Sequence, residues 1–400
     1  MEEWKEYKLG EICSKIGSGA TPKGGKEAYL GGATSLIRSQ NVLDFAFSWD
    51  GLAYINDEQA TKLNGVEVIK NDVLLNITGD SVARVCIVPD SALPARVNQH
   101  VSIVRGNKSK VRNEYILYYL QFKKQHLLSL ARGGATRNAL TKGMIEDFTI
   151  LLPQLEEQDK IVSILKSLDD KIEINRRINE NLEHQAQALF KSWFVDFEPF
   201  KDGEFVESEL GMIPKGWRVG SLFDVAEIFD KIRKPLSGRD RENMDRIYPY
   251  YGATSCMDYV DNYLFDGIYT LIGEDGSVVK EDGLPYMQYV WGKFWVNNHA
   301  HILQGKNGFS TEMIHVMLSI TNIQHLVTGA VQAKLSQANM QKILVALPPI
   351  DVINKIRPLI DKLYQKRRNL EDENSRLAEL RDTLLPKLMS GELKVNEIEI

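Results

Sequence analysis

The chain has 400 residues, of which 43% are hydrophobic and 26% are charged, and its formal net charge is −5. This length exceeds what one hydrophobic core usually serves, and the composition excludes a disordered or collagen-like polymer. A charged N-terminus and the lack of any run of about 18 apolar residues predict a cytoplasmic protein without membrane-spanning helices.

Short apolar runs in the first half predict β-strands. These runs cover residues 73–77, 82–88 and 97–104. Apolar side chains then recur at helical spacing over residues 112–130, which predicts a helix. An apolar run at residues 148–152 ends at Pro153, and a period of 3.6 residues follows from residue 155 to about 195. This order predicts a strand, a break and a long helix.

The second half shows the same order of elements. A link rich in glycine and acidic residues, at 199–217, leads to strand-like runs at residues 267–272 and 300–303. A helical pattern covers residues 311–326, and a second long helix is expected from residue 351 to about 389. Mixed strands and helices in both halves predict an α+β fold.

Internal repetition divides the chain in the same way. The sequence Val-Asn-Gln-His ending at His100 matches Val-Asn-Asn-His ending at His299, and Pro153 matches Pro348. A repeat of about half the chain indicates two similar globular parts, each followed by a long helix. We therefore expect globular domains at residues 1–154 and 199–350, and helical spacers at residues 155–198 and 351–400.

The two long helices carry leucine and isoleucine at steps of three, four and seven, including Ile172 and Ile178, which is the pattern of a coiled-coil seam. Two equal helices of one chain can cover each other, so we expect an antiparallel pair, each helix on the order of 60 Å long. Asn179 and Asn374 occupy equivalent positions, either as buried amides that fix the register or as solvated residues at the seam edge. Pro358 is expected near the first turn of the second helix or at a kink.

Positive charge is concentrated in one stretch of the first half. Residues 82–142 contain 11 lysines and arginines but only two acidic residues, whereas residues 1–154 as a whole contain 19 basic and 16 acidic residues. Residues 199–350 are net acidic, with 14 basic against 18 acidic residues. A local basic excess of this kind is typical of a nucleic-acid contact.

A turn with glycine and polar side chains lies between a helix and a strand in each half. The first glycine turn, residues 133–141, reads Gly-Gly-Ala-Thr-Arg-Asn-Ala-Leu-Thr. The second glycine turn, residues 329–336, reads Gly-Ala-Val-Gln-Ala-Lys-Leu-Ser. Each turn alone is explained by a flexible loop, but its recurrence in the repeat favours a shared function.

The sequence resembles the specificity subunit of type I restriction-modification systems over nearly its whole length. Both halves begin with a tryptophan before a strand-like entry, Trp4 or Trp217, and both contain a glycine turn. Residues 17–22 (Gly-Ser-Gly-Ala-Thr-Pro) and 249–254 (Pro-Tyr-Tyr-Gly-Ala-Thr) add to the likeness. The most specific feature, at residues 151–172, is a strand end, a proline, Glu-Glu-Gln and a helix with Leu-Asp-Asp-Lys-Ile. The second copy departs from it by lacking Glu-Glu-Gln.

This resemblance implies two pseudo-repeated target-recognition domains of mixed α/β structure, separated by two long helices that form an antiparallel coiled-coil pair. Each domain would read one half of a bipartite target in double-stranded DNA, and the helices would set the spacer. The implied partners are two methyltransferase (modification) subunits docked on the helices and a restriction subunit with translocase and nuclease activity. S-adenosylmethionine would belong to the methyltransferases, and ATP and Mg to the nuclease, so this chain would hold no cofactor and no catalytic residue.

Candidate DNA contacts are of two kinds. Arginine and amide side chains in the glycine turns suit base edges, whereas lysines and arginines elsewhere suit phosphates. In the first half the candidates are Arg84, Arg96, Lys108, Lys110, Lys123, Lys124 and Arg132, with Thr136, Arg137 and Asn138 in the turn. In the second half they are Lys231, Arg233, Lys234, Arg239, Tyr251, Lys280 and Lys293, with Gln332 and Lys334 in the turn.

Other classes of function receive less support. A fused methyltransferase would need an Asn/Asp-Pro-Pro-aromatic element, and the nearest string, around Pro348, has neither flank. His299 and His301 lie two apart on an expected strand face without an evident third ligand, and the three separated cysteines form no zinc motif, so no metal site is expected. A coiled-coil adapter whose globular halves bind proteins stays open as the alternative.

Overall fold

The computed structural model describes residues 4–22, 29, 31–133, 138–329 and 332–395. The chain forms two compact units, the first of Met1–Ile174 with Glu373–Ile400 and the second of Asn175–Asp372. Helices α6 (Leu155–Phe194) and α11 (Ile350–Met389) belong to both units, because the unit boundaries fall inside them. The two long helices are thus confirmed, with ends within a residue or two of those predicted. None of the described helices is long and apolar enough to span a bilayer.

The described residues of the first unit form three sheets. Two have four strands, in the orders β2–β9–β6–β7 and β4–β3–β8–β5, and the third pairs β1 with β10. The strands are β1 (Lys5–Lys8), β2 (Cys13–Ser18), β3 (Thr34–Ile37), β4 (Ala53–Ile55), β5 (Glu67–Val68), β6 (Val73–Asn76), β7 (Val85–Ile87), β8 (Ala95–Val97), β9 (Val101–Gly106) and β10 (Thr149–Leu152). Their pairs are antiparallel except that of β3 with β8.

Helices of the first unit cover one face of the β2–β9–β6–β7 sheet. These are α1 (Leu9–Ile12), α3 (Asn113–Phe122), α4 (Lys124–Arg132) and α5 (Lys142–Glu146), whereas α2 (Asp57–Lys62) packs through Ala60 on β3 and β4 of the other sheet. Val73 and Leu75 share a core with Tyr115 and Tyr118 of α3, whereas Leu74, on the opposite face of β6, belongs to a second core. Burial on both faces explains why this strand reads as a continuous apolar run.

Local backbone turns shorten some of the predicted elements. The strand expected at 82–88 forms only over β7, since Ala83 has a positive φ of 66°. The run at 97–104 divides into β8 and β9, because Asn98 Oδ1 accepts a hydrogen bond from the His100 N–H at 3.0 Å and closes a turn between them. The helix expected at 112–130 divides at Lys123, whose φ of −93° and ψ of 16° end α3.

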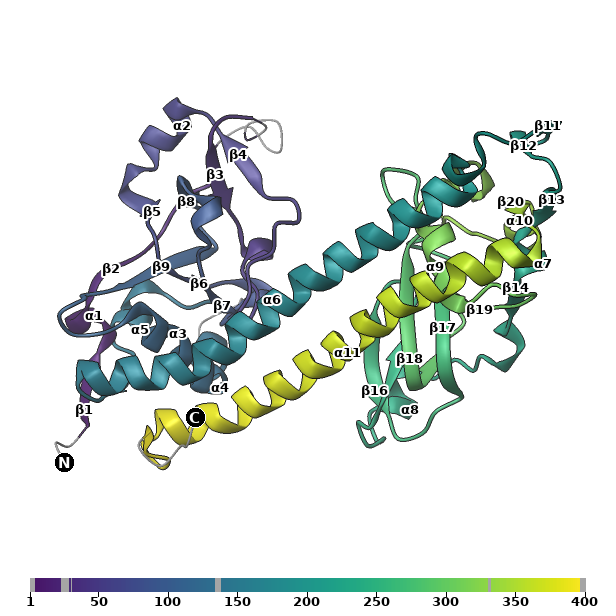
Figure 1. Cartoon of the computed structure of the whole chain (residues 1–400). Coiled ribbons are helices and arrows are strands. Elements are labelled where there is room, and N and C mark those ends of the chain that lie inside the picture. Colours follow the sequence, from purple (N-terminus) through teal and green to yellow (C-terminus); the bar gives the residue numbers. More distant parts are fainter. Residues whose placement is uncertain (1–3, 23–28, 30, 134–137, 330–331, 396–400) are drawn as a thin grey trace. The chain divides into compact units, whose positions relative to one another are not determined.

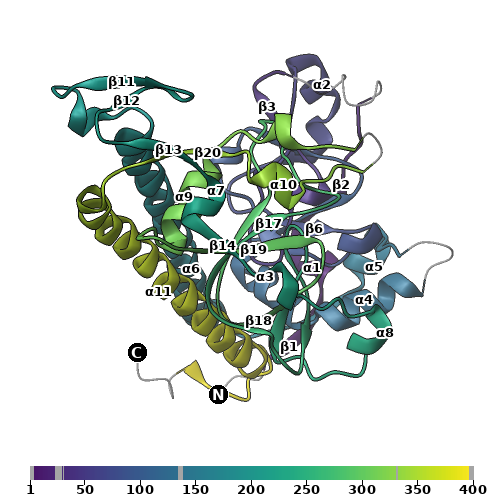
Figure 2. The same cartoon turned by 90° about the vertical axis from the view of Figure 1, so that its right-hand side faces the viewer.

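The second unit has one longer sheet, in the order β14–β19–β17–β18–β15–β16, and the pairs β13–β20 and β11–β12. Its strands are β11 (Phe205–Ser208), β12 (Gly211–Pro214), β13 (Arg218–Ser221), β14 (Ala226–Ile228), β15 (Tyr248–Tyr251), β16 (Cys256–Val260), β17 (Phe265–Gly273), β18 (Met287–Val296), β19 (Ala300–Gly305) and β20 (Leu344–Leu347). Its short helices are α7 (Leu222–Val225), α8 (Gly238–Arg241), α9 (Thr311–Ser319) and α10 (Gln337–Met340). The β11–β12 hairpin follows α6 and stands beside its C-terminal end (Figure 2).

The two units share a strand plan. β13 pairs with β20 as β1 does with β10, and β15 runs parallel to β18 as β3 does to β8. Where the second unit has the single strand β18, the first has β7 and β8, because Pro89 and Pro94 lie between these and cannot donate to a strand ladder. The helix expected at 311–326 is α9 followed by a 3-10 turn at Gln324–Leu326.

Helices α6 and α11 lie side by side and antiparallel within each unit (Figure 1). In the first unit, Arg381 Nη1 lies 2.8 Å from Asp169 Oδ1, and Asn374 Nδ2 donates to the Ile172 carbonyl at 3.4 Å. In the second unit, Asn179 Nδ2 donates to the Arg367 carbonyl at 3.4 Å. Residue numbers rise along α6 while their partners' numbers fall along α11, so the predicted antiparallel pair is confirmed.

The seam between α6 and α11 differs from the expected one around Asn175 and Asn179. Ile172, Asn175 and Asn179 are buried, whereas Ile178 is 38% exposed, so the prediction that Ile178 lies in the seam is wrong. Asn175 and Asn179 lie three and seven residues after Ile172 and therefore share its face of the helix, whereas Ile178 lies six residues after it and does not. Asn179 is therefore a buried seam amide, whereas the half-buried Asn374 lies at the seam edge. Pro358 lies inside a continuous α11, beyond its first turn.

Candidate nucleic-acid interface

The first glycine turn is joined to the end of β6 by backbone hydrogen bonds. The Leu140 N–H donates to the Ile77 carbonyl at 2.8 Å, and the Gly79 N–H donates to the Asn138 carbonyl at 3.1 Å. Gly79 has a φ of 74°, a conformation that side-chain-bearing residues rarely adopt. Asn138 is exposed in this setting, while Thr136 and Arg137 lie outside the described residues.

The second glycine turn is joined to the end of β17 by the same bonds. The Leu335 N–H donates to the Glu274 carbonyl at 2.8 Å, and the Gly276 N–H donates to the Ala333 carbonyl at 2.9 Å. Gly276 has a φ of 76°, matching Gly79. Gln332 and Lys334 are exposed beside these bonds. The repeat in the sequence therefore corresponds to a repeated backbone arrangement at the candidate DNA contacts.

A histidine accompanies each glycine turn. His100 Nδ1 lies 2.6 Å from Thr78 Oγ1, and His299 Nδ1 lies 2.5 Å from Asp275 Oδ1. Thr78 bridges to the first turn and Asp275 to the second. Sequence reasoning did not include these histidines among the DNA contacts, although the repeated Val-Asn-x-His was visible.

The basic candidates of the first unit do not form one patch. Arg84 belongs to the loop after β6, next to the first glycine turn, and Arg132 ends the helix that leads into this turn. Lys108 and Lys110 are exposed but follow the end of β9, whereas His100 precedes its start. Among the remaining basic candidates of this unit, Lys124 is paired with Asp44 and the Lys123 ammonium lies 4.3 Å from the centre of the Phe122 ring.

Two arginines among the candidates have structural roles instead. Arg96 is 7% exposed, and its guanidinium donates to the Ala60 carbonyl at 3.2 Å and to Asn64 Oδ1 at 2.9 Å. The Arg233 guanidinium donates to Glu274 Oε2 at 2.6 Å and to the Ala300 carbonyl at 2.7 Å. Their burial and internal partners contradict the predicted phosphate contacts.

The other candidates of the second unit are dispersed. Lys231, Lys234, Arg239 and Lys280 are exposed on loops and short helical turns. The Lys293 ammonium lies 4.6 Å from the centre of the Tyr263 ring, and Lys293 pairs with Asp266 near the start of β17 rather than at its turn-bearing end. The Tyr251 ring packs against Phe294, and burial raises the pKa of its hydroxyl to about 12.

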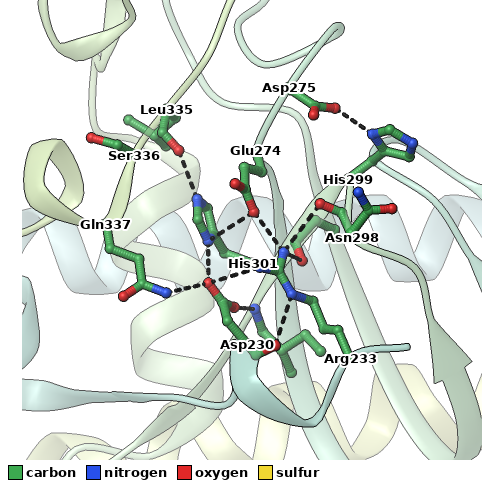
Figure 3. Close-up of polar contacts among 12 residues, drawn as sticks. Asp230, Arg233, Glu274, Asp275, Asn298, His299, His301, Leu335, Ser336 and Gln337 are labelled. Carbon is green, nitrogen blue, oxygen red and sulfur yellow. Dashed lines mark hydrogen bonds and ion pairs between the residues drawn. The ribbon is translucent and has the colours of Figure 1, made fainter. Parts of the chain in front are cut away.

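The exposed second glycine turn lies above a cluster of ionisable side chains (Figure 3). Asp230, Glu274 and His301 are the one group of possible metal ligands found among the described residues. The Arg233 guanidinium lies between the two carboxylates, 3.4 Å from Asp230 Oδ2, and supplies the positive charge that a metal would bring. Only His301 of the two histidines expected on one strand face lies in β19, since His299 precedes its first residue, and the two imidazoles contact different carboxylates.

A family model described as the type I restriction modification DNA specificity domain matches residues 1–184 and 214–379. The chain belongs to this family. The specificity subunit of the type I restriction enzyme MjaIX of Methanocaldococcus jannaschii is 27% identical over 426 residues, covering 99% of this chain and 95% of the relative. That of the HindI enzyme of Haemophilus influenzae is 24% identical over 473 residues, covering 98% and 100%. A type I restriction-modification S subunit from M. genitalium, known from a crystal structure, has the same fold, with a TM-score of 0.53, 16% identity and 96% coverage of both chains.

Each specificity-domain match covers a globular part and most of the long helix that follows it. In this specificity-domain protein, each of these repeats contains one glycine turn, one Val-Asn-x-His sequence and the strand end to which the turn is hydrogen-bonded. The candidate interface is therefore a property of the repeat and occurs once in each unit.

Proposed function

We propose that the chain is the DNA-recognition subunit of a type I restriction-modification complex and that each unit reads one half of a bipartite target. The observation that carries this proposal is the pair of glycine turns, which are joined to their sheets by the same backbone hydrogen bonds. Two copies of one exposed arrangement suit a target with two half-sites. The family match supports DNA recognition over the alternative of a protein-binding adapter.

Within this proposal, the glycine turns contact base edges and nearby cations contact phosphates. Asn138 and Gln332 present amides that suit adenine, and Arg84 and Arg132 lie where they would reach the adjacent backbone. The second unit is net acidic, so partner subunits supply much of its positive charge.

We assign the helix pair two further roles, setting the spacer between the half-sites and docking two methyltransferase subunits. Both helices have 40 residues and carry their seam through both units, which supports a spacer of defined length. The chemistry then belongs to the partners: methyl transfer from S-adenosylmethionine in the methyltransferases, and ATP- and Mg-dependent translocation and cleavage in the restriction subunit. This chain contributes recognition without a catalytic residue, in the cytoplasm where it meets DNA.

Duplex-binding experiments test this function. Fluorescence anisotropy of labelled duplexes, with and without modification subunits of the same system, should show binding that weakens as salt rises, since phosphate contacts release counterions. Binding that does not depend on salt, or no binding even with the modification subunits, would support the adapter. Incubation of the purified chain with labelled S-adenosylmethionine and DNA should transfer no label; transfer would identify the chain as an enzyme.

A further inference from the structure

A cluster of the buried Asp230 and His301 and the half-buried Glu274 lies directly beneath the second glycine turn (Figure 3). His301 is 1% exposed, and its Nδ1 lies 2.5 Å from Asp230 Oδ2 while its Nε2 lies 2.7 Å from the Leu335 carbonyl oxygen. Both ring nitrogens therefore face acceptors, and the imidazole bridges the Asp230 carboxylate, in the 3-10 turn after β14, to the backbone of the second glycine turn.

Three further contacts join this cluster to the turn and the helix after it. Gln337 Nε2 donates to Asp230 Oδ2 at 2.7 Å, and the Lys334 ammonium lies 3.4 Å from Glu274 Oε1. The Leu335 N–H donates to the backbone carbonyl of Glu274. Asp230 Oδ1 accepts from the Ile302 N–H at 3.0 Å, so the same carboxylate binds both the strand β19 and the α10 side of the turn.

The first unit has no ionisable counterpart of this cluster at the equivalent places. His301 lies two residues after His299, which places Ser102 at the matching position after His100. Ile16 pairs with Val104 as Ile228 pairs with Leu303, which matches Ser18 to Asp230. Ile77 accepts from Leu140 as Glu274 does from Leu335. Two serines and an isoleucine thus replace the aspartate, the histidine and the glutamate.

Burying charged groups costs free energy unless each group is paired, and satisfied polar networks favour one conformation of the groups they join. Here every charged side chain of the cluster has an opposite charge or a carbonyl beside it. The free-energy cost of burying charge is therefore compensated in the second unit, beneath its exposed glycine turn.

We propose that Asp230, Glu274 and His301 are positioning residues that fix the second glycine turn for base recognition, and that the sequence preference of the second unit alone depends on them. This inference rests on the proposed function for its DNA consequence, whereas the anchoring of the turn is a property of the free chain. The two turns share a backbone arrangement but are held by different chemistry: charge in the second unit, and neutral side chains in the first.

Amide exchange in the full-length chain tests the anchoring. D230N replaces a carboxylate oxygen, which accepts hydrogen bonds, with an N–H donor that faces His301 and Gln337. H301Q removes the imidazole that bridges Asp230 and the Leu335 carbonyl. Both variants should exchange on the order of tenfold faster at residues 333–337, with no change at residues 138–142. The matched control S102A alters the equivalent buried position of the first unit and should leave residues 333–337 unchanged. The double variant D230N/Q337E restores an acceptor opposite the new donor and should slow exchange again.

Selection of bound duplexes from a randomised pool, with the modification subunits present, tests the consequence for DNA. D230N and H301Q should weaken the base preference at one half-site several-fold and leave the other half-site as in the unmodified chain. E274Q, which keeps the side-chain shape, serves where D230N does not fold. Unchanged amide exchange at residues 333–337 in the variants would overturn the proposal, whatever the DNA result. Faster exchange would also overturn it if the base preference weakened at both half-sites or at neither. A parent chain that selects no sequence would refute the proposed function instead.

Discussion

Removing Arg381 should destabilise the first unit through an unpaired carboxylate. Arg381 Nη1 lies 2.8 Å from Asp169 Oδ1, Tyr118 donates to the other oxygen at 2.7 Å, and the guanidinium lies 3.7 Å from the centre of the Phe45 ring. Loss of one partner of a buried ion pair costs about 3–5 kcal/mol. The pair here has side chains that are 11% and 18% exposed, so solvent screening lowers the estimate for R381M to about 2–3 kcal/mol. Loss of the cation–ring contact adds about 0.5–1 kcal/mol.

The loss of folding stability in R381M should depend on pH in a defined direction. Burial raises the pKa of Asp169 above its ordinary value, although the hydrogen bonds from Tyr118 and Arg381 oppose this. A carboxyl group with a raised folded-state pKa favours the folded state below its ordinary pKa, and this contribution is lost as pH rises through the folded-state value. Without Arg381 that pKa rises further. The destabilisation should therefore be largest near neutral pH and shrink as pH falls towards about 4.

Amide exchange of α3 as a function of urea measures the stability of the first unit separately, which a global signal from a two-unit chain does not. The double variant D169N/R381M removes both charges and should recover to within about 1 kcal/mol of the parent chain, since no charge is left unpaired. A double variant as unstable as R381M, or an R381M deficit that does not change with pH, would refute the electrostatic explanation.

Three further outcomes follow from the same structure. Burial raises the pKa of Asp230, but the interactions with His301 and Arg233 outweigh this effect and hold the pKa below its ordinary value. The anchoring of the second glycine turn should therefore persist above about pH 4 and weaken as pH falls through the lowered pKa. Amide exchange at residues 333–337, corrected for intrinsic rates, should rise only below that pH. Leu165→Ala, at a fully buried seam position, should cost about 2–5 kcal/mol, against less than about 0.5 kcal/mol for Ile178→Ala at the exposed one; equal shifts in urea midpoint would contradict the seam assignment. Arg132→Ala should lower the salt slope of DNA binding by about 1, whereas the control Lys108→Ala should not; the reverse result would place the DNA at the other end of β9.

The long helices could be predicted almost to the residue because their signal is local. A helical period of apolar side chains, ended by Pro153 on one side, needs no knowledge of distant residues. The exposed position of Ile178 was missed because it lies six residues after Ile172, whereas the seven-residue step from Leu165 through Ile172 leads to the polar but buried Asn179. The division of α3 from α4 at Lys123 carries no glycine or proline, so nothing in the local sequence marks it.

The candidate interface was predicted in part. The repeated sequence located both glycine turns, because matching segments of a repeat adopt matching structures. Counting charge could not show that Arg96 is buried or that Arg233 is bound by carboxylates, since these depend on strand pairing. The cluster of Asp230, Glu274 and His301 joins β17, β19 and the turn after β14 across long stretches of sequence, and only the folded sheet brings these residues together.

The most direct measurement is a genome-wide map of methylated bases in cells that carry the chain with its modification subunits, compared with cells in which residues 133–141 are replaced by those of a relative. The chain as it stands should direct methylation to a motif of two short sequences separated by a fixed number of unspecified bases. The replacement should change one of these sequences and leave the other sequence and the gap unaltered. A single continuous motif, or a replacement that changes both sequences, would contradict independent recognition by the two units.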